Sequence, residues 1–261
     1  MMFMQNAMIG VALISIVAAV IGTYIVTRRM VFISGGITHA CFGGLGLGYY
    51  LGVSPMLMAS VFAVGGALGA ERLSRDGVRR DSAIAVIWAL GMALGILFIF
   101  LTPGYVPELN TFLFGNVLTV SRVDLWAFSV LTVVLLGFYA LYHRLIVAVS
   151  FDSDFSLTRN LPVKWVNLIM TVLTGVSIVM TIRLIGIMLL MSLVSLPQLT
   201  AEKFTRRYLP MMLLSGVISL VGGMGGLWGA YAIDVPASAA IVLLLVGFYV
   251  IASLLRRLRR G

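Results

Sequence analysis

The stretch NAMIGVALISIVAAVIGTYIV, residues 6–26, decides the class of fold. It carries no charged side chain, and it is as long as the roughly 20 apolar residues with which an α-helix crosses about 30 Å of hydrocarbon. No Lys or Arg precedes it, and the first one, Arg28, follows it. Since a signal peptide begins with basic residues, we expect this run to remain in the protein as a transmembrane helix.

Apolar runs of similar length recur along the chain, separated by short polar segments. They predict an all-α polytopic integral membrane protein, a single transmembrane domain over residues 1–261, with about nine transmembrane helices. The expected helices cover residues 6–26, 30–51, 55–70, 82–101, 124–142, 165–182, 184–201, 209–228 and 237–254. Only Arg183 separates the sixth from the seventh, so these two are either short helices joined by a tight turn or one long bent element.

The composition excludes a water-soluble protein, because 61% of the residues are hydrophobic and only 10% are charged, with a mean hydropathy of +1.11. The net charge of +9 does not indicate a nucleic-acid partner, since the basic residues lie between the apolar runs and not along one solvated face. Membrane lipid is the expected surrounding. Cys41 is the only cysteine, so no internal disulfide can form, and no Cys/His cluster predicts a structural metal site.

The basic residues predict the orientation, because Lys and Arg are enriched in cytoplasmic loops. Of the 18 Lys and Arg residues, only Arg122 and Arg183 fall in one set of alternate loops. All the others, from Arg28 to the C-terminal run RRLRR, fall in the opposite set. This asymmetry fits an odd number of spans, an external N-terminus and a cytoplasmic C-terminus. We therefore expect a multi-pass protein of the cell (inner or plasma) membrane.

Function is expected where a polar residue interrupts a span, because an ionisable group at the bilayer centre costs about 2.5 to 3.5 kcal/mol. His39 lies in the middle of the second span, within GGITHACFGGLGLG, residues 35–48. Gly36, Ala40, Gly44 and Gly48 are spaced four residues apart and form a ridge of small residues that another helix can approach closely. His39 borders this ridge, so its side chain should point into the bundle.

Two interpretations of His39 stay open. As a packed residue it would hydrogen-bond to a backbone carbonyl. As a functional residue it would lie on a pathway or serve as a ligand position. Cys41 points to nearly the opposite side of the helix, so it cannot join His39 in binding one ion. Asp234, expected near the external surface, would either attract a cation to the pathway or cap the helix that follows Pro236.

Other motifs are absent or weak. No GxxxxGK[ST] motif occurs, so the chain cannot bind and hydrolyse ATP by the P-loop route, and no catalytic residue is assigned. The 15 methionines scatter without a repeating spacing on one face, so they are expected to fill the core and not to bind soft metals.

Five segments, in this order, resemble permeases of ABC-type zinc and manganese importers. They are MVFISGGITHACFGGLGLGYYLG (residues 30–52), FLFGNVLTVS (112–121), VSFDSDFS (149–156), GIMLLMSLVSLPQLTA (186–201) and YAIDVPASAAIVLL (231–244). The resemblance covers nearly the whole chain. One position departs from the family pattern, because the acidic residue usually found four positions before the histidine is replaced by Gly35.

The resemblance implies a permease that forms a homodimer and receives a divalent metal ion, zinc, manganese or iron, from an external metal-binding protein. Two cytoplasmic ATP-binding subunits would drive transport when they close. The metal ion would be the substrate, with no permanently bound cofactor. This chain has no nucleotide-binding motif, which agrees with ATP binding by separate subunits.

The resemblance also implies a short cytoplasmic helix that contacts the ATPase. Our first choice is PQLTAEKFTRR, residues 197–207, because a proline is expected to end the seventh span before a polar, basic segment. The coupling residues would be Pro197, Thr200, Glu202, Lys203, Phe204 and Arg206. The alternative for the basic cluster is a plain positive-inside anchor. Asp152 and Asp154, in the other large cytoplasmic loop, are the second candidates for the contact.

Two other classes of function remain possible on the residues alone. A secondary transporter or channel for a cation would need no ATPase, but the inverted repeats or interrupted helices expected in matching halves are not evident. An intramembrane enzyme would need a catalytic group, and His39 has no Asp, Glu or second His in its own span.

Overall fold

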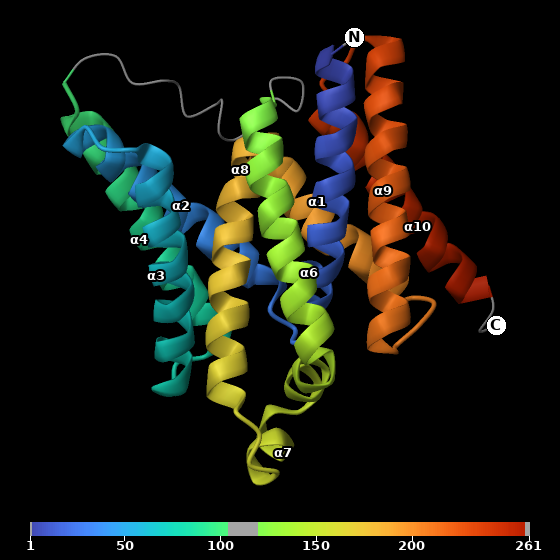
Figure 1. Ribbon diagram of the computed structural model, residues 1–261, viewed down its shortest axis with the longest axis horizontal. Coiled ribbons are helices and arrows are strands. Elements are labelled where there is room, and N and C mark those ends of the chain that lie inside the picture. Colours follow the sequence, from blue (N-terminus) through green and yellow to red (C-terminus); the bar gives the residue numbers. More distant parts are fainter. Residues whose placement is uncertain (1, 104–119, 259–261) are drawn as a thin grey trace.

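The computed structural model describes residues 2–103 and 120–258, and this part of the chain consists of helices and their connections (Figure 1). The helices are α1 (Met2–Thr27), α2 (Val31–Leu51), α3 (Pro55–Arg75), α4 (Arg80–Leu101), α6 (Arg122–Phe151), α7 (Ser153–Thr158), α8 (Val163–Ala201), α9 (Tyr208–Ile233) and α10 (Ala237–Leu258). The all-α polytopic architecture predicted from the sequence is confirmed. Residues 104–119, which include most of the motif at 112–121, and the last two arginines lie outside the described residues.

Eight helices in this described part are long and apolar enough to cross a membrane, one fewer than the spans that the sequence predicts. The difference lies in α8, which contains both the sixth and the seventh predicted spans in one helical stretch of 39 residues. At 1.5 Å per residue such a helix would be about 58 Å long, roughly twice the hydrocarbon thickness. It therefore cannot cross the bilayer once as a straight rod.

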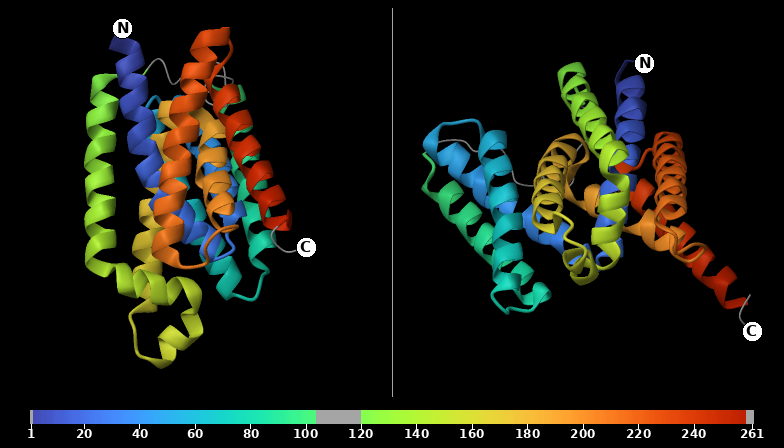
Figure 2. Two further views of the ribbon diagram at one scale, coloured as in Figure 1. Left: turned by 90° about the vertical axis from the view of Figure 1, so that its right-hand side faces the viewer. Right: turned by 60° about the horizontal axis from the view of Figure 1, so that its bottom comes forward.

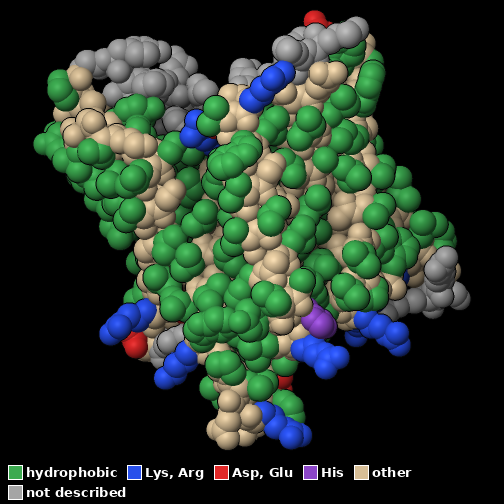
Figure 3. Space-filling view, in the orientation of Figure 1, with side chains coloured by type: hydrophobic (Ala, Val, Ile, Leu, Met, Phe, Trp, Pro, Cys, Tyr) green, Lys and Arg blue, Asp and Glu red, His purple; other side chains and the backbone are tan. Residues whose placement is uncertain are grey.

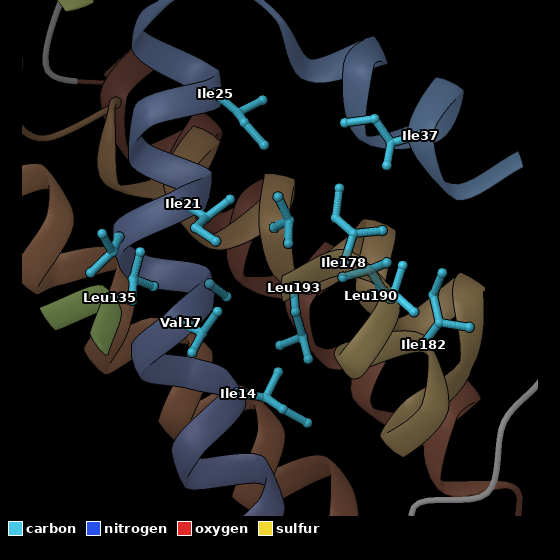
Figure 4. Packing of buried hydrophobic residues seen from close by; sticks show 14 of the residues in the cluster. Ile14, Val17, Ile21, Ile25, Ile37, Leu135, Ile178, Ile182, Leu190 and Leu193 are labelled. Carbon is cyan, nitrogen blue, oxygen red and sulfur yellow. The ribbon is translucent and has the colours of Figure 1, made fainter. Parts of the chain in front are cut away.

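A glycine breaks α8 into two limbs. Gly186 has φ 76° and ψ 174°, a backbone conformation that is essentially restricted to glycine. Arg183, expected to separate two spans, is instead helical, and the chain changes direction three residues later. The limbs lie at an angle to each other in Figure 1, and Ile178 and Leu190 from the two sides of the break lie close together in Figure 4. Of the two arrangements that the sequence allows, α8 therefore has the second, one long bent element.

Local sequence explains the turn between α2 and α3. Gly52 ends α2 with φ 67°, the left-handed conformation, and its N–H bonds to the carbonyls of Gly48 and Tyr49. Ser54 then caps α3, with its hydroxyl accepting a hydrogen bond from the Leu57 N–H, and Pro55 occupies the first helical position. The result is a short reversal that lays α3 back along α2.

The core of the molecule lies between α1 and α8. Figure 4 shows Ile14, Val17 and Ile21 of α1 turned toward Leu190 and Leu193 of α8, and all five side chains are buried. In contrast, most side chains of α4 and α10 are not buried within this chain. These two helices therefore lie at the periphery, with apolar surface left for lipid or another subunit.

The two ends of the bundle differ in charge. Figure 3 shows an apolar middle band, with most of the visible Lys and Arg side chains gathered at the end where α7 lies. Figure 2 shows α7 and its flanking turns standing off that end of the bundle. The opposite end carries Arg122 and Arg183 at the start of α6 and before the break in α8. We call the end with α7 the basic end.

Candidate functional site

His39 lies on α2 against the neighbouring helix α4. Its ring stacks on the indole of Trp88, with ring centroids 4.1 Å apart and planes inclined by 14°. Its Nδ1 lies 3.1 Å from Sδ of Met92, one turn further along α4. The imidazole is only partly buried. A histidine that serves only for packing was expected to bond to a backbone carbonyl. His39 instead contacts the thioether of Met92 and the ring of Trp88.

Gly35 lies one turn before His39 on α2, beneath the same tryptophan. A Cβ atom at this position would lie 3.1 Å from Cζ3 of Trp88 and 3.2 Å from Cε of Met191. The space that a side chain at residue 35 would need is thus occupied by the indole ring and a methionine methyl. The missing carboxylate of the metal-importer pattern is not supplied by another nearby acid, since among the described residues no Asp or Glu forms an ion pair with His39.

The ridge of small residues on α2 brings both α3 and α4 close. A Cβ on Gly36 would lie 2.7 Å from Ile84 of α4, and one on Gly48 would lie 2.6 Å from Pro55 Cα of α3. Gly44 meets the backbone of α3 at Met58 in the same way, and the Ala40 methyl faces Gly66 on α3. All four ridge residues are buried. Because this packing holds α4 against α2, it also places Trp88 and Met92 beside His39.

Asp234 lies far along the chain and in a different group of helices. It ends α9 with φ 55° and ψ 49°, and its N–H bonds to the carbonyl of Ala230. Asp tolerates this left-handed conformation better than most residues. It therefore forms the C-cap of α9, and not the predicted cap of the helix after Pro236. Its side chain is exposed, and α9 packs on α1, α8 and α10 while His39 faces α4, so the structure does not bring the two residues together.

The segment 197–207 does not form the expected short helix. Pro197 is buried inside α8, which continues to Ala201, so the prediction that proline ends this span is wrong. The helix continues because neighbouring helices stabilise it here: Gln198 donates from Nε2 to the Ala18 carbonyl of α1 at 2.7 Å. Thr200 is also buried, and its hydroxyl donates to the Leu196 carbonyl.

Only the end of that segment is accessible. Glu202 forms the C-cap of α8, and Phe204 and Arg206 are exposed in the turn before α9. Lys203 places its Nζ 4.9 Å from the centre of the Tyr249 ring on α10, a cation–π contact that ties the turn to the last helix.

The second candidate segment does form a separate short helix, α7. Asp152 caps it, accepting a hydrogen bond at Oδ1 from the Phe155 N–H at 2.8 Å, and Asp154 lies exposed in its first turn. The helix lies outside the bundle. Its apolar side chains Phe155 and Leu157 are at least half exposed. The guanidinium of Arg159 lies over the Phe155 ring. These side chains form part of the accessible surface at the basic end.

The two candidate segments share one cavity at the basic end. This cavity, of about 530 Å³, is lined by Glu202 and Arg206 on one side, by Phe151 and Ser153 on the other, and by Arg28 and other residues at the end of α1. Arg28 is held there by a hydrogen bond from Nη1 to Oδ1 of Asn167 on α8, 2.7 Å long. The cavity therefore lies between the start of α7, the end of α1 and the turn that follows α8.

Sequence reasoning missed Trp88 and Met92 as neighbours of His39. They are spaced four residues apart, so they lie on one face of α4. That spacing was the available signal, but nothing in the sequence says which face of α4 meets α2. Within the described residues no group of three or more His, Cys, Asp or Glu side chains could hold a metal ion.

Comparison with known proteins adds three findings. The model of the family described as "ABC 3 transport family" matches residues 1–256. An uncharacterized membrane protein of Synechocystis sp. is 38% identical over 98% of this chain and 91% of its own length. The manganese transport system membrane protein MntC of Listeria monocytogenes is 28% identical over 97% of this chain and 90% of its own length.

The chain is also similar to solved structures. PsaBC from Streptococcus pneumoniae in complex with Fab contains a chain with a TM-score of 0.84 to this one. It is 26% identical and covers 97% of this chain and 91% of its own. The helical arrangement described above is therefore also found in a chain of that solved structure.

Proposed function

The chain belongs to the ABC 3 transport family, and on that premise we propose that it imports a divalent metal ion, zinc, manganese or iron, together with two cytoplasmic ATP-binding subunits and an external metal-binding protein. It is a multi-pass plasma-membrane permease subunit of an ABC transporter, and thus a transport subunit and not an enzyme. The whole chain would act as one permease domain, with the ion as substrate and no permanent cofactor.

The observation that carries the proposal is the position of α7. It is a capped helix with exposed apolar side chains, it stands off the basic end, and it shares a cavity with the ends of α1 and α8. A subunit driven by a separate ATPase needs such a projecting element, whereas a secondary transporter or channel does not. We therefore assign ATPase docking first to α7, with Asp152 and Asp154, and second to the turn containing Glu202, Lys203, Phe204 and Arg206.

The charge difference between the two ends supports the orientation. With the basic end in the cytoplasm, α7 faces the ATPase side, and the N-terminal end of α1 faces outward, as the positive-inside rule requires. Asp234, exposed at the opposite end, would then face the external binding protein and attract a cation toward the pathway.

His39 is proposed as a transient metal ligand on the translocation pathway. A neutral imidazole binds zinc and other transition metals, and a single ligand holds an ion weakly enough to release it. Since the described part of one chain offers no three-ligand group, further ligands would come from a second copy in a homodimer. The partly exposed His39 and the unburied face of α4 are consistent with a partner at this side.

Metal uptake by cells tests this function. The permease, its ATP-binding subunit and its binding protein would be expressed in bacteria that lack their own zinc and manganese importers. We expect metal accumulation with wild-type permease and little with His39→Gln or His39→Ala at equal membrane abundance. Wild-type uptake by both variants would reduce His39 to a packing residue.

A further inference from the structure

The residue that contacts Nδ1 of His39 favours one tautomer of the ring. The thioether sulfur of Met92 has no hydrogen to donate, so the contact at 3.1 Å is a hydrogen bond only if Nδ1 carries the proton. In the neutral ring this leaves the lone pair on Nε2. No partner for Nε2 is found among the described residues, and the ring is partly exposed, so Nε2 is the atom available to a ligand.

Trp88 fixes the plane of the same ring. Its indole stacks on the imidazole at a 4.1 Å centroid distance and also covers Gly35. A side chain at residue 35 would meet the indole at 3.1 Å, so the ring would have to shift by a few tenths of an ångström to admit one. The surroundings of His39 thus contain Met92, Trp88 and Gly35, which are uncharged, where the family pattern has a carboxylate.

We propose that Met92 and Trp88 hold His39 with Nδ1 protonated, so that the neutral ring presents Nε2 to a metal ion, and that this site without a carboxylate selects zinc-class ions over manganese. The reason is ligand chemistry: imidazole suits zinc and its neighbours, whereas manganese prefers carboxylate and other oxygen ligands and binds nitrogen sites most weakly in the divalent series. The inference rests on the proposed import function and adds its substrate class. Met92 and Trp88 act here as positioning residues, because the contacts that define their role are with His39.

Uptake measurements with paired variants test the selectivity. For wild-type protein reconstituted with its ATPase and its external binding protein, we expect zinc to be taken up at concentrations where an equal amount of manganese competes poorly. Met92→Leu keeps the size of the side chain but removes the acceptor, and should raise the KM for zinc about 10-fold with a smaller change in maximal rate. Met92→Gln, whose amide oxygen can accept from Nδ1–H, should restore most of the loss.

A spectroscopic measurement separates positioning from packing. In 15N-histidine-labelled protein, the His39 signals should report a neutral ring protonated at Nδ1, with His143→Gln used to assign the second histidine. Met92→Leu should lose this tautomer preference while Met92→Gln keeps it. A ring protonated at Nε2 in the wild type, or an unchanged tautomer in Met92→Leu, would contradict the inference even if that variant assembled poorly.

A carboxylate restored at residue 35 gives the opposite test. Gly35→Asp should displace the Trp88 ring and shift competition toward manganese, whereas Gly35→Ala, which crowds the same ring without adding an oxygen ligand, should lower zinc uptake without any gain for manganese. Equal competition by manganese and zinc in the wild type would overturn the selectivity alone. No ATP-dependent uptake of any divalent metal would instead overturn the proposed function.

Discussion

The carboxylate of Asp124 in the first turn of α6 pairs with Nη2 of Arg183 on α8, at 2.8 Å. Ser121 donates a second hydrogen bond to the same carboxylate at 2.7 Å. Asp124 is only 17% exposed, whereas Arg183 is 53% exposed. The pair joins α6 to α8 one turn before the break at Gly186, at the end of the bundle opposite α7.

Loss of one partner of this pair should weaken the bundle modestly. Arg183→Met leaves a largely buried carboxylate without its cation, and we expect a loss of about 1 kcal/mol in the free energy of unfolding, because the arginine is half exposed. Asp124→Asn should cost a similar amount. Thermal unfolding in detergent of both variants and the double variant measures the coupling, and strictly additive losses would show that the pair contributes nothing.

The break in α8 should depend on glycine at residue 186. Gly186→Ala forces a side chain into φ 76°, ψ 174°, and strain of this kind costs about 1–3 kcal/mol. Gly137→Ala is the matched control, since a Cβ there meets open space and its backbone is helical. We expect lower thermal stability and lower transport for Gly186→Ala only. Equal behaviour of the two variants would mean that the bend is not needed.

A substitution in α7 should reduce coupling to the ATPase more than a substitution in the turn that follows α8. Phe155 and Phe204 are exposed to similar extents, 56% and 51%, at the same end of the molecule. Phe155→Ala should leave membrane abundance unchanged and reduce stimulation of ATP hydrolysis and transport by about 10-fold, the loss expected for an apolar anchor worth 1 to 2 kcal/mol. Phe204→Ala should have little effect. The reverse pattern would move the docking site to the turn.

Single cysteines should report which end lies outside. In a Cys41→Ala background, Arg122→Cys should react with an impermeant thiol reagent in intact cells, and Arg79→Cys should react only after permeabilisation. Both positions are exposed, so access to the reagent depends on the side of the membrane. Labelling of Arg79→Cys in intact cells would invert the orientation derived from the basic residues.

The spans could be predicted from the sequence because each membrane helix satisfies its own backbone and needs only a sufficient apolar length. The same logic failed at Pro197, and at Arg183 it could not choose between two short helices and one long bent element. Proline is tolerated inside α8 because buried neighbours such as Gln198 stabilise the helix, and the true break depends on the backbone angles of Gly186, which no composition rule identifies.

The site could be predicted only in part. His39 stood out because a polar residue within a span is rare. Its partners on α4 depend on how two helices pack, and the i, i+4 spacing of Trp88 and Met92 carries no information about which helix they meet. The start of α7 could be predicted from the sequence, since Asp152 is a suitable N-cap. The exposure of Phe155 could not, because it depends on how the helices pack.

The most direct test of the account is ATP-dependent metal uptake by purified components in liposomes. The permease would be reconstituted with and without its ATP-binding subunits, with the binding protein and radioactive zinc outside and ATP inside. We predict uptake only when the ATP-binding subunits and ATP are both present. Uptake at the full rate by the permease alone would contradict the account and identify the protein as a secondary transporter or channel.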